Sequence, residues 1–220
     1  MFRIKICGVT TPSDALHAVA CGADAIGINC YVGSPRFVPE ESARKIVGAV
    51  GGRAEVVAVF VNETPEAIEA LCARLGIGTV QLHGDEPEGV AARLKVRRIK
   101  AIHASNTPDP ERFASYPCEA FLLDSGGRSE YGGTGRELPW GELPERFGRL
   151  LAAPGSRGSG KTWILAGGLT PGNVGRAIAM VFPSAVDVAS GVESSPGRKD
   201  PAKVASFIEN AKAGFRLAGA

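Results

Sequence analysis

Short apolar runs alternate along the chain with segments whose apolar residues recur at the helical period. We predict strands at eight of these runs, with a helix after each: 2–7, 24–29, 54–61, 78–82, 97–103, 120–124, 162–166 and 185–189. Several runs are apolar almost throughout, as in strands that are covered on both faces. Eight alternating units without a shared repeat motif favour a closed ring over a solenoid. We therefore predict an α/β fold in which residues 1–220 form a single (β/α)8 TIM barrel domain.

The predicted helices begin at recognisable caps. Thr11 and Thr64 each place a capping hydroxyl before a proline, whose missing N–H costs nothing at the first helical position. The apolar residues after Thr64 share one helical face: Ala67, Ile68, Leu71, Cys72 and Leu75. We therefore expect Cys72 to lie in the core.

Composition limits the class of protein. The 25 Lys and Arg nearly balance the 23 Asp and Glu, and the net charge of +2 gives no field that favours nucleic acid. No apolar run reaches the roughly 18 residues of a membrane span, and the N-terminus lacks a signal-peptide pattern, so we expect a cytoplasmic protein. The five cysteines include no C-x-x-C pair, which indicates free thiols rather than disulfides or a zinc site.

Residues 155–162, GSRGSGKT, match the phosphate-binding loop of nucleotide hydrolases. In those proteins the loop follows a strand and opens a helix, whose N–H groups point at the phosphates. Here the motif follows a predicted helix around 142–151 and precedes a strand, which is the reverse order. We interpret it as a solvated connection, and a nucleotide-binding switch protein is the alternative from another class.

The ends of the predicted strands carry chemically useful side chains. Barrel enzymes place their active sites at the carboxyl ends of the strands. Those ends and the loops after them hold Cys7, Asn29, Arg36, Asn62, Gln81, His83, His103, Asp124, Gly167, Gly168, Ser190 and Gly191. A thiol, a carboxylate, an arginine and two imidazoles are therefore expected at one rim.

Two glycine-bearing loops, AGGLTPGNV and VASGVESSPG, follow the last two predicted strands. Small residues let backbone N–H groups approach an anion, and the start of a helix adds a favourable dipole. Barrels commonly bind phosphate after strands seven and eight. We predict a phosphate site at Gly167, Gly168, Ser190 and Gly191, although tight turns would explain either loop alone.

Cys7 and Asp124 are candidates for a general base and a general acid. A cation beside a thiol lowers its pKa, and Lys5, which has the same strand parity as Cys7, could supply that charge. Asp124 ends an apolar run, where desolvation raises a carboxyl pKa and favours the protonated acid. A base and an acid across a barrel mouth fit a proton-shuttling isomerase, while an inert thiol and a capping carboxylate are the alternatives.

Four further features lie at the same rim. Arg36 follows a proline, and we expect its guanidinium to clamp a planar carboxylate, with an exposed arginine as the alternative. His83 is expected to orient the substrate rather than transfer a proton, and the role of His103 is open. The glycine-rich loop 125–135 suits a lid over the mouth, with simple disorder as the alternative.

The same residues lie in motifs that resemble the phosphoribosylanthranilate isomerase family from end to end of the chain. The motifs are KICG (5–8), SPRFV (34–38), VFVN (59–62), QLHG (81–84), LLD (122–124), GGTG (132–135), AGGL (166–169), DVASGVE (187–193) and PGRKD (196–200). No single motif is decisive, but nine in this order are specific.

The resemblance implies an isomerase of tryptophan biosynthesis that acts without metal or cofactor. The reaction is the Amadori rearrangement of N-(5-phosphoribosyl)anthranilate to 1-(2-carboxyphenylamino)-1-deoxyribulose 5-phosphate. The implied partner is a small phosphorylated substrate. We expect the protein to be a monomer or homodimer that binds neither nucleic acid nor a membrane.

The resemblance also implies roles for individual residues. Asp124 would protonate the ribose ring oxygen, Cys7 would remove the C2 proton, and Arg36 would hold the anthranilate carboxylate. The implied substrate-binding set is Arg36, His83, Gly167, Gly168, Asp187, Ser190 and Gly191, in which the role of Asp187 is the least defined.

Two stretches depart from the family, and related barrels compete with it. Cys30 and Gly33 replace bulkier residues in NCYVG, and APGSRGSGKT is a longer connection than usual. The histidine-pathway isomerase should show two acidic strand ends and an internal repeat, and indoleglycerol phosphate synthase needs a lysine at the rim. Neither pattern is found, and Cys7 with Asp124 disfavours a barrel that serves only as a scaffold.

Overall fold

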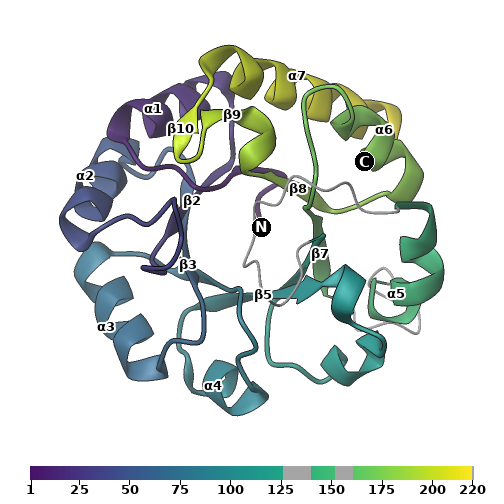
Figure 1. Ribbon diagram of the computed structural model, residues 1–220, viewed down its shortest axis with the longest axis horizontal. Helices are drawn as coiled ribbons and strands as arrows, with labels where there is room; N and C mark the ends of the chain where they lie inside the picture. Colours follow the sequence, from purple (N-terminus) through teal and green to yellow (C-terminus); the bar gives the residue numbers. More distant parts are fainter. Residues whose placement is uncertain (126–139, 152–160, 220) are drawn as a thin grey trace.

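Eight parallel strands close into a barrel, and helices form a ring around it (Figure 1). This computed structural model describes residues 1–125, 140–151 and 161–219. The strands are β1 (Ile4–Ile6), β2 (Ala25–Asn29), β3 (Glu55–Phe60), β4 (Thr79–Leu82), β5 (Arg97–His103), β6 (Ala120–Asp124), β7 (Thr162–Leu165) and β8 (Ala185–Val188). Each strand pairs with the next, and β8 pairs with β1 to close the ring. The predicted TIM barrel is confirmed, and each strand lies inside its predicted run.

The outer ring consists of α-helices that follow the strands. They are α1 (Pro12–Cys21), α2 (Glu40–Val50), α3 (Pro65–Leu75), α4 (Glu88–Arg93), α5 (Leu143–Leu151), α6 (Val174–Val181) and α7 (Pro201–Leu217). α1 and α3 begin as predicted, because the hydroxyls of Thr11 and Thr64 accept hydrogen bonds from backbone N–H groups of the first turn, over 3.1 and 3.3 Å. Cys72 is buried, as predicted for the inner face of α3.

The prediction of an α-helix after every strand is wrong after β5. There the chain forms two 3-10 segments, η1 (Ala104–Asn106) and η2 (Pro110–Phe113). Pro108 and Pro110 cannot donate the N–H bonds that an α-helix would need at these positions, so only short turns form.

The barrel interior combines an apolar cluster with a few polar side chains. The cluster takes alternate strand positions, and its members are Phe2, Ala25, Val57, Ile99, Ala101, Ala120, Leu122, Ile164, Ala166 and Ala185. Lys5, Gln81 and Asp187 share the interior with it and are almost completely buried. A buried charge is costly unless it is paired, and a buried amide is costly unless it is hydrogen-bonded, so these three side chains need polar partners.

Two segments singled out in the sequence fall largely outside the described residues. Beyond Ser125, the predicted lid at 125–135 lies outside them, as does GSRGSGKT up to residue 160. α5 precedes that motif and β7 follows it, so the order of elements is the reverse of a phosphate-binding loop, as predicted. Lys161 Nζ donates to the backbone oxygens of Ala114 (3.3 Å) and Tyr116, in the connection that leads to β6.

Among the described helices, none combines the length and apolar character that a membrane crossing requires.

Candidate active site

A cavity opens at the carboxyl ends of the barrel strands. Its lining residues are Cys7, Gly8, Asn29, Ser34, Arg36, Val59, Val61, Gln81, His83, Asp124, Asp187 and Ala189. The structure therefore brings the candidate base, the candidate acid and the candidate carboxylate clamp to one hollow.

A second hollow adjoins the first at the ends of β6, β7 and β8. It is lined by Asp124, Ser125, Ala166, Gly167, Gly168, Leu169, Asp187, Val188, Ala189, Ser190 and Gly191. Asp124, Asp187 and Ala189 line both hollows, which makes them contiguous. All four residues of the predicted phosphate site thus lie beside the candidate acid.

Glycine is required where the loops of this second hollow meet. Gly167 has φ +77°, and a Cβ added there would lie 2.4 Å from the backbone nitrogen of Ser125. A Cβ at Gly191 would lie 1.9 Å from the backbone oxygen of Leu169. Any side chain at either position would force the loops apart, so the paired loops predicted from their glycines are packed backbone against backbone.

Lys5 and Asp187 form a buried ion pair beneath Cys7. Lys5 Nζ donates to Asp187 Oδ1 and to Gln81 Oε1, each over 2.9 Å. The register of β1 and β8 sets Lys5 opposite Asp187, which explains the contact. Gly27 on β2 makes room for the group, since a Cβ there would lie 2.6 Å from Cys7 Sγ.

Lys5 lowers the pKa of Cys7 as predicted, but the net shift of that pKa is upward. Burial raises the pKa of the Cys7 thiol, the Asp187 carboxylate raises it further, and Lys5 lowers it without reversing the shift. Asp187 thus cancels much of the cation that the sequence placed beside the thiol. Pairing with Lys5 therefore gives Asp187 a role in the site that does not require contact with the substrate.

A chain of polar contacts leads from Lys5 to the candidate acid. A lysine ammonium can only donate, so the Gln81 atom that faces it is the oxygen, and Gln81 Nε2 donates to His83 Nδ1 over 2.7 Å. The proton of a neutral His83 then sits on Nε2, which lies 3.4 Å from Asp124 Oδ2. Within the described part of the chain, Nε2 makes no hydrogen bond of good geometry, so it is aimed at Asp124 without closing the contact.

His103 lies beside this chain but lines another cavity. Its ring meets that of His83 edge to face, with centroids 5.4 Å apart. Burial and the neighbouring His83 lower the pKa of His103, which favours the neutral ring. That cavity has a volume of about 450 Å³ and is lined by residues of β5 and of the segments that follow β4 and β5, among them Lys100 and Tyr116. The described residues contain no group of three or more His, Cys, Asp or Glu side chains arranged to hold a metal ion.

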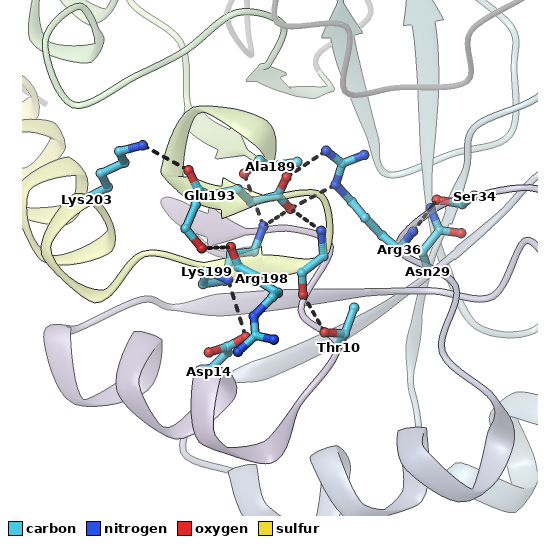
Figure 2. A network of polar contacts seen from close by, with 12 residues as sticks. Thr10, Asp14, Asn29, Ser34, Arg36, Ala189, Glu193, Arg198, Lys199 and Lys203 are labelled. Carbon is cyan, nitrogen blue, oxygen red and sulfur yellow. Dashed lines mark hydrogen bonds and ion pairs between the residues drawn. The ribbon is translucent and has the colours of Figure 1, made fainter.

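Arg36 is buried rather than exposed, and its partner is Glu193. The guanidinium forms a two-point contact with the Glu193 carboxylate, which also accepts from Lys199 (Figure 2). Gln81 was placed at the rim by its strand end but was given no role. Glu193 and Lys199 were missed as individual site residues, and the only signal for them in the sequence was their place in the motifs DVASGVE and PGRKD.

Comparison with known proteins agrees with this geometry. Residues 4–210 match the family model described as N-(5'phosphoribosyl)anthranilate (PRA) isomerase. The N-(5'-phosphoribosyl)anthranilate isomerase of Neisseria gonorrhoeae strain ATCC 700825 / FA 1090 is 44% identical over 211 residues, which cover 95% of this chain and 96% of that protein.

Solved structures of phosphoribosylanthranilate isomerases are also similar to this chain. A phosphoribosylanthranilate isomerase in complex with reduced 1-(o-carboxyphenylamino)-1-deoxyribulose 5-phosphate is 37% identical and superposes with a TM-score of 0.81, covering 97% of this chain and 100% of that one. Monomers generated from the dimeric enzyme of Thermotoga maritima are 39% identical, with a TM-score of 0.80 and the same coverage. The resemblance first drawn from nine motifs is confirmed, and this chain belongs to the N-(5'-phosphoribosyl)anthranilate isomerase family.

Proposed function

We propose that this protein converts N-(5'-phosphoribosyl)anthranilate to 1-(2-carboxyphenylamino)-1-deoxyribulose 5-phosphate, an isomerisation of tryptophan biosynthesis. Its membership of the isomerase family supports the reaction. The observation that carries the mechanism is the shared cavity, in which Cys7, Arg36 and Asp124 line one hollow beside the glycine-bearing loops.

Asp124 acts as the general acid in this proposal. It donates a proton to the ribose ring oxygen, the bond from C1 to that oxygen breaks, and the anilino nitrogen supplies electrons to form an iminium ion. Asp124 is buried at the end of β6, where little water competes for the proton. The Nε2 atom of His83 lies 3.4 Å from Asp124 Oδ2, and its N–H stabilises the carboxylate left after the transfer by closing this distance.

Cys7 acts as the general base in the next step. The iminium ion acidifies the C2–H bond, the Cys7 thiolate removes that proton, and the resulting enolamine tautomerises to the ketone. Because burial and Asp187 raise the pKa of Cys7, the resting group is a thiol, and the thiolate is a minor species at neutral pH. The rate should therefore increase as the pH rises.

Two anchors hold the substrate between acid and base. Arg36 binds the anthranilate carboxylate, and the backbone around Gly167, Gly168, Ser190 and Gly191 binds the phosphate. Asp187 and His83 complete the substrate-binding wall. Binding energy from both ends of the substrate then fixes C1 and C2 against the catalytic groups.

The remaining parts of the proposal concern the setting of the reaction. We take residues 1–220 as one barrel domain that works in the cytoplasm without metal or cofactor, as a monomer or homodimer. Its partner is the phosphorylated substrate, and nucleic acid is not bound. The dimeric enzyme of Thermotoga maritima supports the homodimer.

One assay tests the activity. Freshly made phosphoribosylanthranilate should lose its fluorescence when the purified protein is added with no metal present, and the product should be the deoxyribulose phosphate. Retention of the fluorescence at high protein concentration would contradict the proposal.

The catalytic assignment is tested by two isosteric changes. Cys7→Ser and Asp124→Asn should each lower kcat by at least roughly 100-fold, the scale of lost acid or base catalysis. The thermal unfolding of both variants should stay close to that of the parent. Near-parental kcat in either variant would refute its role.

A further inference from the structure

The guanidinium of Arg36 is held by a carboxylate from the far end of the chain. Glu193 begins β9 (Glu193–Ser195), which pairs with β10 (Arg198–Lys199) in a short antiparallel hairpin. Arg36 Nε donates to Glu193 Oε1 over 2.9 Å, and Nη2 donates to Oε2 over 2.7 Å. Figure 2 shows the third guanidinium nitrogen turned away from Glu193.

Glu193 is itself fixed from several sides. Its side chain is only 4% exposed, and Oε1 also accepts from Lys199 Nζ over 2.8 Å and from the N–H of Gly197 over 3.4 Å. Lys199 Nζ donates in addition to the backbone oxygen of Ala189, over 3.1 Å. The carboxylate therefore cannot rotate without breaking charge-assisted bonds.

The stem of Arg36 is fixed as well. It crosses the backbone of Gly8, where an added Cβ would lie 2.5 Å from Arg36 Cδ. A guanidinium is planar and offers parallel donors along more than one edge. Since Glu193 occupies the edge formed by Nε and Nη2, the end formed by Nη1 and Nη2 is the one left for a ligand in the cavity that Arg36 lines.

The charges of this cluster favour an anion. Arg36 and Lys199 carry two positive charges against the one negative charge of Glu193, when Lys199 is protonated. Burial lowers the pKa of Lys199, and Glu193 opposes that shift without reversing it, while Glu193 raises the pKa of Arg36. With both cations protonated, one positive charge stays uncompensated beside the cavity that Arg36 lines, where a bound carboxylate would neutralise it.

We propose that Glu193 is a positioning residue, which turns the end of Arg36 into the cavity so that it recognises the carboxylate of the anthranilate group. This inference rests on the proposed function, which gives the substrate that carboxylate and assigns it to Arg36. Glu193 does not touch the substrate, and its effect reaches the reaction only through Arg36.

The test compares two substrates. One is phosphoribosylanthranilate, and the other is the same compound made from aniline, which lacks the carboxylate. Glu193→Gln keeps the shape of the side chain but places an N–H group against Arg36 or Lys199. For the anthranilate substrate KM should increase by roughly 10- to 100-fold with a smaller change in kcat. For the aniline substrate, kcat/KM should stay within about 3-fold of the parent, because its reaction never used the clamp.

Two further variants make the result specific. Ser194→Ala removes a hydroxyl that donates to the backbone oxygen of Arg198 in the same hairpin. It should leave kcat/KM unchanged for both substrates. Arg36→Ala should lower kcat/KM for the anthranilate substrate alone, and adding Glu193→Gln to it should have no further effect.

The outcomes separate the two proposals. If Glu193→Gln lowers kcat/KM equally for both substrates, or for neither, Glu193 is not a positioning residue for the carboxylate. If Arg36→Ala lowers kcat/KM equally for both substrates, the assignment of Arg36 fails instead. Should Glu193→Gln not fold, Lys199→Met serves in its place, because it removes the uncompensated charge. It should raise KM for the anthranilate substrate alone by about 10-fold, and equal losses on both substrates would overturn the inference.

Discussion

Two buried ion pairs in this barrel have the same chemistry but different surroundings. Lys5 pairs with Asp187 over 2.9 Å, and Lys100 pairs with Glu86 over 2.7 Å. Both lysines lie on strands and are almost completely buried. Burial and pairing therefore do not distinguish a residue of the site from a residue of the scaffold.

The direction in which each lysine points makes the difference. Ile99 and Ala101, the neighbours of Lys100, belong to the interior cluster, so Lys100 faces outward from β5. Lys5 has the opposite orientation and meets Gln81 and Asp187 inside the barrel. The alternation of a strand thus decides which of two similar pairs reaches the cavity.

The outer pair is a clamp for the backbone. Glu86 accepts from the N–H groups of Asn62 (2.9 Å) and Gly84 (2.9 and 3.1 Å), and Lys100 donates to the backbone oxygen of Leu82 over 3.4 Å. Burial alone would raise the pKa of Glu86, but Lys100 and these N–H donors outweigh it and lower the pKa. The pair joins the loops after β3 and β4, so we expect it to contribute stability rather than catalysis.

The largest effect is expected from breaking the outer pair. Lys100→Met leaves the Glu86 carboxylate buried without its cation, which should reduce the free energy of unfolding by ~3–5 kcal/mol. The kcat of the protein that remains folded should change by less than about 3-fold, because the pair does not line the active-site cavity. Urea denaturation and a steady-state assay on the same preparation measure the two quantities.

Lys5→Met is the matched control for this prediction. It breaks a buried pair of the same kind, so a similar loss of stability is expected, but its kcat should also fall because Cys7 loses a cation. If Lys100→Met lowers kcat as much as Lys5→Met does, the distinction between a scaffold pair and an active-site pair is wrong.

Strand parity also explains how much of the site could be predicted from the sequence. Cys7, His83 and Asp124 were found because the carboxyl ends of apolar runs converge in any barrel. Glu193 could not be found in that way, since 157 residues separate it from Arg36 and no local pattern links them. The net shift of the Cys7 pKa was misjudged because it depends on burial and on the opposing charge of Asp187 as well as on Lys5, and only Lys5 lies at a spacing that the sequence reveals.

The inner pair should be detectable in the pH dependence of the reaction. Asp187 raises the pKa of Cys7, so Asp187→Asn should move the midpoint of the rising limb of kcat/KM to lower pH. Lys5 acts in the opposite direction, so Lys5→Met should move the same midpoint to higher pH. The measurement is the profile of kcat/KM from neutral to alkaline pH, which reports groups of the free enzyme.

The midpoint distinguishes this effect from a contact between Asp187 and the substrate. A lost contact would lower kcat/KM at every pH without moving the midpoint. Shifts of the same sign in Asp187→Asn and Lys5→Met would contradict the electrostatic account of Cys7.

The smallest effect concerns the side chain that joins the inner pair to the acid. Gln81→Glu replaces the N–H group that faces His83 Nδ1 with an oxygen, so the proton of a neutral His83 should move to Nδ1 and leave Nε2 unprotonated opposite Asp124. We expect kcat to fall about 10-fold with little change in KM, because the carboxylate left on Asp124 after proton transfer loses the donor that stabilises it, while the substrate contacts stay in place. The nitrogen chemical shifts of His83 report the tautomer directly. Gln81→Met, which removes both polar groups, should leave the tautomer unconstrained and give a smaller loss; an unchanged tautomer in Gln81→Glu would show that Gln81 does not set it.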